Sequence, residues 1–190
     1  MEEKKMDRRV KYSLMVIRKS FITLLKKKPI SKITIKEICD VADVNRATFY
    51  AHYLDQYDLL HQIEQDLIDE INQYLFGHDL NANLSAVSEE PIELLDKILQ
   101  YVKENAELFD LFLNLEEDIH FQQEVIQIVG NQHFASMTAD RDSSEYMFLF
   151  YASGSIGVIQ KWLHDGMKKS TREMAELILK LSISGRMAFQ

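Results

Sequence analysis

The stretch that decides the fold is TIKEICDVADVNRATFYAHY, residues 34–53. Thr34 and Glu37 have the T-x-x-E spacing of a capping box, which predicts a short helix from Thr34 to Ala42. A break follows at Asp43, and Asn45 is a favourable N-cap for a second short helix that ends near residue 52 or 53. Two short helices joined by a turn of about three or four residues predict a helix-turn-helix.

The second of these helices is polar over most of its surface. Beyond Ala47 and Phe49 it has little apolar surface, and it offers outward the side chains of Arg46, Thr48, Tyr50 and His52. A helix of this composition beside a tight turn is suited to contact phosphates and base edges in the major groove of DNA. The sequence therefore predicts a nucleic-acid contact at this helix.

Charge is divided unevenly along the chain. The net charge of −8 by itself argues against a nucleic-acid partner. Residues 1–53, however, hold 13 basic against 6 acidic residues, a balance of +7, and residues 54–190 hold 9 against 24, a balance of −15. Each basic cluster alone also fits a solvated tail or a helix end. A basic front, an acidic body and a helix-turn-helix together favour DNA binding by the first part.

The composition limits the class of protein and its compartment. No stretch approaches the roughly 18 unbroken apolar residues of a membrane span, and the N-terminus lacks the apolar core of a secretory signal. The single cysteine, Cys39, excludes an internal disulfide, so we expect a cytoplasmic protein. Cys39 lies on the inner face of its helix, where a redox-sensing role is not expected.

Helical periodicity covers most of the chain, without a convincing strand or repeat. We expect an all-α fold of about nine helices, with a three-helix helix-turn-helix domain over residues 1–54 and a second helical domain over residues 55–190. Outside the opening stretch, helices are expected over residues 7–28, 55–76, 91 to a break at 105, 107–113, 115–134, 144–165 and 170–187. Residues 77–90 and 136–143 are expected to be loops.

The helix over residues 144–165 is apolar almost all round, so it must be buried on every face. In a chain this small, we expect one face to meet a second copy, and small residues there would let two helices approach closely. Close packing within one chain is the alternative. The expected interface residues are Ser153, Gly154, Gly157, Val158, Lys161, Trp162, Leu177 and Leu181.

Bulky, mostly aromatic residues recur in the second domain and suggest a cavity for a small apolar or aromatic effector. A plain packed core is the alternative, and the sequence does not separate the two. The candidate lining residues are Tyr101, Phe109, Phe112, Phe121, Phe134, Met147, Phe150 and Tyr151.

The run TIKEICDVADVNRATFYAHYLDQYDLL, from residue 34 to residue 60, resembles the DNA-binding signature of the tetracycline-repressor (TetR) family of bacterial transcription regulators. The segment YASGSIGVIQKWLHDGM, residues 151–167, resembles one large subgroup of the same family. The resemblance implies that residues 55–190 form an effector-binding and dimerisation domain. It also implies DNA contacts at Thr34, Lys36, Asn45, Arg46, Ala47, Thr48, Tyr50, His52, Tyr53 and Gln56.

Three positions of the run from residue 34 to residue 60 bear on this expected role. Tyr53 matches an aromatic residue that either closes the small core or meets the DNA backbone. Asp43 stands in the turn where the family usually has glycine, and aspartate tolerates a left-handed turn better than most residues. Gln56 stands where the family often has lysine. The missing charge predicts a salt dependence of DNA binding that is shallower by nearly one unit.

The favoured hypothesis is a homodimeric repressor that a small-molecule effector releases from a near-palindromic operator. The first alternative is a DNA-binding regulator or activator that a protein partner controls. The second is a helical metalloenzyme, because Glu117 and His120 have the E-x-x-H spacing of half a di-iron site. That site needs a second copy and further carboxylates, so we expect no metal, no cofactor and no enzyme activity.

Overall fold

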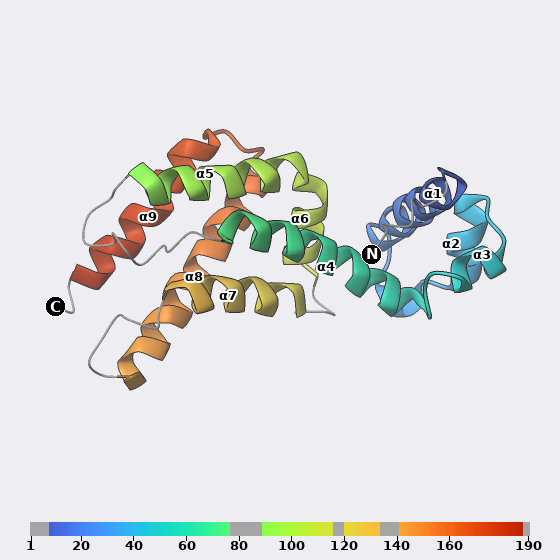
Figure 1. The fold of residues 1–190 in the computed structure, drawn as a ribbon, viewed down its shortest axis with the longest axis horizontal. Helices are drawn as coiled ribbons and strands as arrows, with labels where there is room; N and C mark the ends of the chain where they lie inside the picture. Colours follow the sequence, from blue (N-terminus) through green and yellow to red (C-terminus); the bar gives the residue numbers. More distant parts are fainter. Residues whose placement is uncertain (1–7, 77–88, 116–119, 134–140, 188–190) are drawn as a thin grey trace, which may run out of the picture. The chain divides into compact units, whose positions relative to one another are not determined.

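The computed structural model describes residues 8–76, 89–115, 120–133 and 141–187, and every regular element within these ranges is helical. This confirms the all-α expectation. The elements in chain order are α1 (Arg8–Leu25), the 3-10 helix η1 (Ile30–Lys32), α2 (Ile35–Ala42), α3 (Arg46–Tyr50), α4 (Gln56–Leu75), α5 (Glu89–Glu104), α6 (Ala106–Leu113), α7 (His120–His133), α8 (Arg141–His164) and α9 (Thr171–Met187). Figure 1 labels the α-helices. None of these described helices is both long and apolar enough to cross a membrane.

Several helices begin at other residues than the sequence predicts. α5 begins at Glu89, ahead of Pro91, because proline is tolerated in the first turn, where its missing N–H would have no helical partner. α7 begins at His120 instead of residue 115, and α8 begins at Arg141 instead of residue 144. Most of the two expected loops lies outside the described residues.

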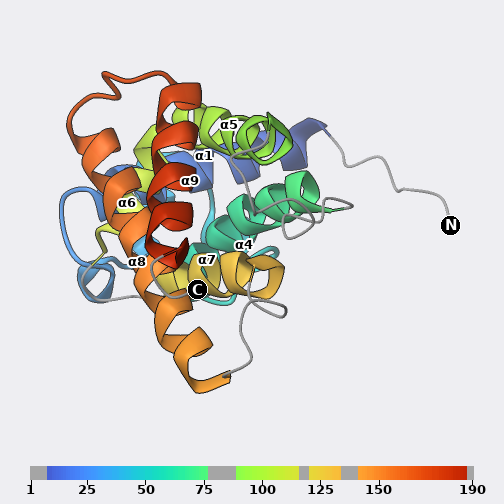
Figure 2. The ribbon, with the colours of Figure 1, turned by 90° about the vertical axis from the view of Figure 1, so that its left-hand side faces the viewer.

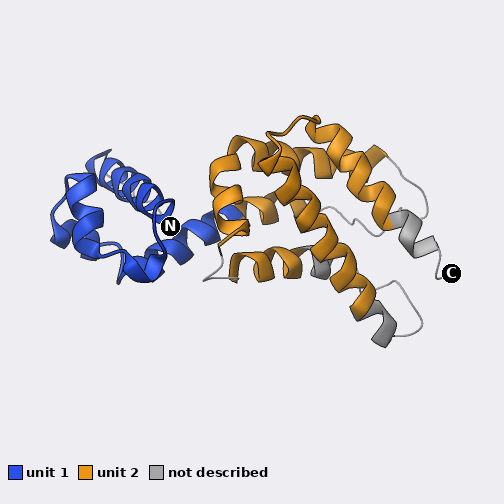
Figure 3. Cartoon of the chain, turned by 180° about the vertical axis from the view of Figure 1, so that it is seen from behind, with its two compact units in different colours: residues 1–67 blue, residues 68–190 orange. Residues whose placement is uncertain are grey.

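The chain divides into two compact units, residues 1–67 and residues 68–190 (Figure 3). The sequence placed the division between residues 54 and 55, whereas the units meet inside α4. The reason is that Leu59, Leu60 and Ile63 of α4 are buried in the first unit. The first part of α4 therefore belongs to the same unit as the helix-turn-helix.

One apolar core holds the first unit together. α1 contributes Ile17 and Phe21, α2 contributes Ile38, and α3 contributes Phe49, all of them fully buried. α2 packs against both α1 and α3. Helices as short as α2 and α3 are not stable alone in water, so their helical structure depends on this shared core.

A left-handed residue ends α2, as the sequence predicts for its turn. Asp43 has φ 52° and ψ 48°, and its N–H donates to the Cys39 carbonyl. The N–H of Val44 donates to the same carbonyl at 3.1 Å. These two bonds close the end of α2 and turn the chain toward α3.

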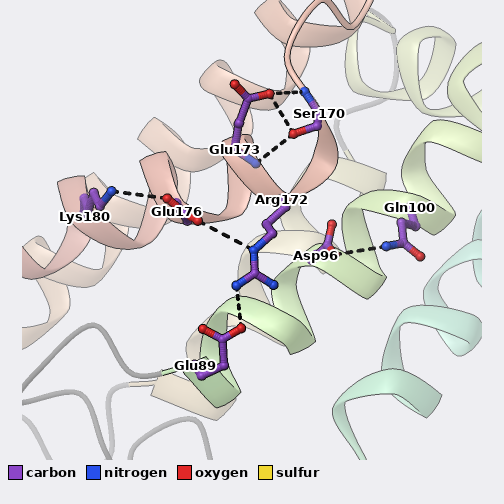
Figure 4. A network of polar contacts seen from close by, with 8 residues as sticks. All are labelled: Glu89, Asp96, Gln100, Ser170, Arg172, Glu173, Glu176 and Lys180. Carbon is purple, nitrogen blue, oxygen red and sulfur yellow. Dashed lines mark hydrogen bonds and ion pairs between the residues drawn. The ribbon is translucent and has the colours of Figure 1, made fainter.

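The second unit contains α5 to α9. α5 packs along α9, and α8 packs on α6 and α7 (Figure 2). α9 begins with a capping box, in which Ser170 Oγ accepts from the Glu173 N–H at 3.2 Å and Glu173 Oε2 accepts from the Ser170 N–H at 2.7 Å. Arg172, in the first turn of α9, pairs with Glu89 at the start of α5 (Figure 4). The starts of α5 and α9 are thus tied together.

The left-handed turn leads to a stability prediction. We expect Asp43→Ala to be less stable than Asp43→Gly by about 1 kcal/mol, because the Cβ of alanine has a steric cost at positive φ that glycine, without a Cβ, does not have. Urea unfolding followed by circular dichroism measures the difference. Asp40→Ala, at an exposed helical position of α2, is the matched control and should change stability little. Equal stability of the two Asp43 variants would contradict the prediction.

Candidate nucleic-acid interface

α3 is a short helix that one buried residue anchors. The Oδ1 of Asn45 accepts from the Ala47 N–H at 2.8 Å, which satisfies one of the free donors at the start of the helix. Phe49 is fully buried, and its carbonyl accepts from the His52 N–H at 3.0 Å, so the chain continues past the helix as a tight turn. The buried ring fixes which side of α3 faces outward.

The predicted DNA contacts differ in exposure. The exposed members are Thr34, Lys36, Asn45, Arg46, Ala47 and Tyr50, and the half-buried members are Thr48, His52 and Gln56. Arg46 and Tyr50 are one helical turn apart on α3, and the Tyr50 side chain is 57% exposed. A guanidinium and a phenol on the same face can reach phosphate oxygens or base edges.

Thr34 forms the predicted capping box at the start of α2. Its hydroxyl accepts from the Glu37 N–H at 3.3 Å, and Glu37 Oε2 accepts from the Thr34 N–H at 3.0 Å. Lys28 Nζ lies 2.6 Å from the other Glu37 oxygen. Hydrogen bonds from Lys28 and Thr34 lower the pKa of Glu37 to about 2, so the cap stays ionised at any ordinary pH. Its charge offsets that of Lys28, whereas Lys36 is exposed beside it.

Asp55 starts α4 in the same way. Its Oδ1 accepts from the N–H groups of Tyr57 and Asp58, both at 2.9 Å, and thus caps the helix. Asp58 in turn accepts from the Leu54 N–H at 2.8 Å. Gln56 is the first residue of α4 and follows this cap directly.

Tyr53 is corrected from a surface contact to a core residue. Its side chain is 2% exposed, and its ring lies 5.4 Å from that of Phe49, centroid to centroid. The Nε of Arg18 donates to its hydroxyl at 3.2 Å. Of the two roles expected for this aromatic residue, the structure gives it the closing of the core.

Cys39 is buried in the first unit, and burial raises the pKa of its thiol. A neutral thiol without exposure is a poor nucleophile. The structure thus gives Cys39 an ordinary packing role.

The expected interface residues of α8 and α9 lie largely on the surface of the single chain. Exposed residues recur along α8 at steps of three and four. They are Tyr146, Phe150, Ser153, Gly157 and Lys161, and Gly154 beside them is exposed too. A Cβ placed on Gly154 or Gly157 would meet no atom within 4 Å. Close packing within the chain therefore does not account for these glycines. Leu177 and Leu181 on α9 are exposed as well, and Val158 is half-buried.

Trp162 is corrected from an interface residue to a buried one. Its side chain is 5% exposed, and its Nε1 donates to the Lys169 carbonyl at 2.9 Å. The Met167 N–H donates to the Trp162 carbonyl at 2.8 Å. The indole thus closes the corner between α8 and α9 within one chain.

Half of the candidate effector residues lie in one aromatic cluster. Rings of Tyr101, Phe109, Phe121 and Phe112 follow one another with centroid separations of 5.7 to 5.9 Å. These are the distances of packed aromatic pairs. Met147 and Tyr151 are half-buried on α8, and Phe134 lies outside the described residues.

Phe150 does not belong to this cluster. Its side chain is 74% exposed on α8, along the same line as Gly154 and Gly157. Helical periodicity cannot assign a face on a helix that is apolar all round, which is why the sequence placed this ring in a pocket.

Sequence patterns did not identify two polar residues of the first unit, Arg18 and Asp66, as structurally important. Arg18 bonds to Tyr53 and also forms an ion pair with Asp66 on α4. Arg18 falls between the apolar residues of an amphipathic helix, where a solvated charge is the ordinary expectation. Its partners lie 35 and 48 residues away, so no local spacing could have identified them.

Comparison with known proteins identifies the class. A TetR family model described as a transcriptional regulator C-terminal region matches residues 89–184. A curated relative, the "Uncharacterized HTH-type transcriptional regulator YxbF" of Bacillus subtilis (strain 168), is 21% identical over 168 residues. This match covers 87% of the present chain but 43% of the relative, so the chain spans less than half of that protein's length.

Solved structures share the fold. A TetR transcriptional regulator from Streptococcus agalactiae 2603V aligns with a TM-score of 0.68 and 23% identity over 93% of this chain and 96% of that chain. NalD of Pseudomonas aeruginosa, the secondary repressor of the MexAB-OprM multidrug efflux pump, aligns with a TM-score of 0.63 and 16% identity over 94% and 98%. The dihydroxyacetone kinase operon activator DhaS aligns with a TM-score of 0.58 and 15% identity over 93% and 97%.

A helix-turn-helix head, an all-helical second unit and these matches define a DNA-binding transcription regulator. The chain belongs to the TetR family. The family consists of regulators and not of enzymes, which removes the metalloenzyme alternative. Glu117, one half of the E-x-x-H pair behind that alternative, lies outside the described residues.

The start of α4 leads to a prediction about salt. We expect Gln56→Lys to bind DNA more tightly at low salt and to steepen the slope of log affinity against log salt by about 0.9, because it adds one phosphate contact. Gln73→Lys, the same change at an exposed site of α4 in the second unit, is the control and should leave the slope unchanged. Fluorescence anisotropy over a salt series measures both. Equal slopes for Gln56→Lys and the wild type would refute the assignment.

Proposed function

We propose that the chain is a homodimeric repressor of transcription. Two copies of α3 would enter successive major grooves of a near-palindromic operator, and a small apolar or aromatic effector bound in the second unit would release the dimer. The observation that carries the DNA-binding half is the surface of α3, where Arg46 and Tyr50 are exposed one turn apart while Phe49 is buried. A cytoplasmic location belongs to the same proposal.

The dimer rests on the exposed residues of α8 and α9. Tyr146 and Phe150 are large, apolar and mostly exposed, and Leu181 on α9 is more than half exposed. Exposed apolar side chains in a row are a common mark of an association surface. Gly154 and Gly157 lie along the same line and would let a second copy of α8 approach closely.

The effector rests on the aromatic cluster of the second unit. The cluster of Tyr101, Phe109, Phe112 and Phe121 is chemically suited to an apolar or aromatic ligand. Its rings are already in contact, however, so a ligand would have to adjoin or displace them.

This packed cluster favours a second candidate, in which a protein partner controls the regulator or the regulator activates transcription. A fold neighbour, DhaS, is named an operon activator. The two candidates differ in measurable ways. A rise in melting temperature with one of a panel of small aromatic compounds favours the effector, and a reporter gene placed behind the bound site separates repression from activation.

The DNA-binding half has a direct test. The full chain would be used to enrich a binding site from a random duplex library, and its affinity for that duplex would be measured. We expect Arg46→Ala to weaken binding by about five- to 150-fold, the loss typical of an arginine that contacts a base. Tyr50→Ala should also weaken binding.

Lys97→Ala is the matched control, because it removes one exposed positive charge from α5 in the second unit. Circular dichroism checks that all three variants are folded. Enrichment of no site by the wild type, or equal affinity of Arg46→Ala and Lys97→Ala, would contradict the proposal.

The dimer has its own prediction. A Cβ at position 157 meets no atom within 4 Å in the single chain, and leucine improves helix propensity, so we expect Gly157→Leu to fold normally. In a dimer with closely packed α8 helices, the same side chain would clash. Sedimentation at micromolar concentration should therefore show a dimer for the wild type and a monomer for Gly157→Leu.

Glu93→Leu puts the same side chain at an exposed site on α5 and should remain a dimer. A monomeric wild type would refute the dimer. A dimeric Gly157→Leu would place its interface elsewhere.

A further inference from the structure

One side chain of α1 reaches two other elements of the first unit. The Nε of Arg18 donates to the hydroxyl of Tyr53 at 3.2 Å, and its Nη1 pairs with Oδ2 of Asp66. Tyr53 follows α3, and Asp66 lies on α4. The planar guanidinium offers donors in fixed directions, so it can satisfy both partners at once without a change of rotamer.

Tyr53 connects this contact to the recognition helix. Its N–H donates to the Phe49 carbonyl at 2.9 Å, and its ring packs on the Phe49 ring. The hydroxyl at the far end of the Tyr53 ring accepts the hydrogen bond from Arg18. A shift of the Tyr53 ring would therefore carry the end of α3 with it.

Asp66 connects the contact to α4. The helix is anchored in the first unit by Leu59, Leu60 and Ile63, and Asp66 lies next to the last residue of that unit, Leu67. α4 then continues into the second unit as one helix. Arg18 thus connects the residues at the end of α3 to the last residues of α4 that belong to the first unit.

We propose that Arg18 is a positioning residue for DNA binding, which holds α3 in register with α4 through Tyr53 and Asp66 and does not itself contact DNA. The proposal rests on α3 as the DNA-binding element. Loss of the contacts of Arg18 with Tyr53 and Asp66 would leave the first unit folded, because its apolar core remains. α3 would then sample several orientations. Apparent affinity falls in proportion to the fraction of molecules that hold the competent orientation.

Two other roles make different predictions. If Arg18 contacted a phosphate, an uncharged residue in its place would lower the salt slope by about 0.9, and Tyr53→Phe and Asp66→Asn would change binding little. If Arg18 and Asp66 affected DNA binding only through the net charge of the first unit, Asp66→Asn would tighten binding, because it removes a negative charge. Positioning predicts the opposite sign for Asp66→Asn.

The test uses the full chain and the duplex enriched by the wild type. The variants are Tyr53→Phe, which removes only the hydroxyl, Asp66→Asn, which removes only the charge, and Arg18→Lys, which keeps the charge but loses the fork. We expect each to weaken binding by about three- to tenfold, as for loss of one ordinary hydrogen bond, with the salt slope of the wild type.

Asp40→Asn is the matched control, since it removes an exposed carboxylate from α2 and should leave binding equal or tighter. The double variant Tyr53→Phe/Asp66→Asn should lose less than the product of its two single losses, because both act through one guanidinium. Tighter binding by Asp66→Asn, or binding by Tyr53→Phe and Asp66→Asn equal to that of the wild type, would overturn the proposal.

A measurement without DNA keeps the inference separate from the proposed operator. Amide hydrogen exchange should quicken over residues 46–53 in Tyr53→Phe and Asp66→Asn, while the amides of α2 keep their protection. Equal protection of α3 in the wild type and both variants would overturn the positioning role, whatever DNA the protein binds. Uniform loss of amide protection across the first unit would also overturn it, because it would show that these contacts stabilise the whole unit and do not specifically position α3.

Discussion

The first unit depends on the burial of one ring, that of Phe49. α3 has five residues, too few for a helix to be stable in water through its own hydrogen bonds. Full burial of a phenylalanine contributes about 1.5–3 kcal/mol, and the Asn45 cap adds about 1 kcal/mol. The helix therefore exists only as part of the core. The outward direction of Arg46 and Tyr50 is a consequence of where Phe49 is buried.

Polar contacts at helix ends add precision to that core. Glu37 serves the capping box of α2 and also binds Lys28 near the end of α1. In the second unit, Arg172 lies within the capping box of α9 and pairs with Glu89 of α5. Exposed ion pairs contribute little stability one by one. Because each connects a capped helix end to a residue in or just after another helix, their main effect is to fix how the helices are placed against each other.

α8 follows a different rule. Its apolar residues surround the helix, so no single buried face can be read from its periodicity. The single chain buries Ala152, Ile156 and Trp162 and leaves the line through Gly154 and Gly157 open. The same helix thus supplies both core and surface in one chain.

The sequence by itself determined the local structure of this protein. The Thr34 capping box, the Asn45 cap and the left-handed Asp43 all involve residues within a few positions of each other, so local chemistry is enough to place them. Only the tertiary structure decided that Tyr53 enters the core, that Phe150 stays on the surface, and that Arg18 bonds across 35 and 48 residues. Periodicity tells which face of a helix is apolar, but which neighbour covers that face depends on how the whole chain packs.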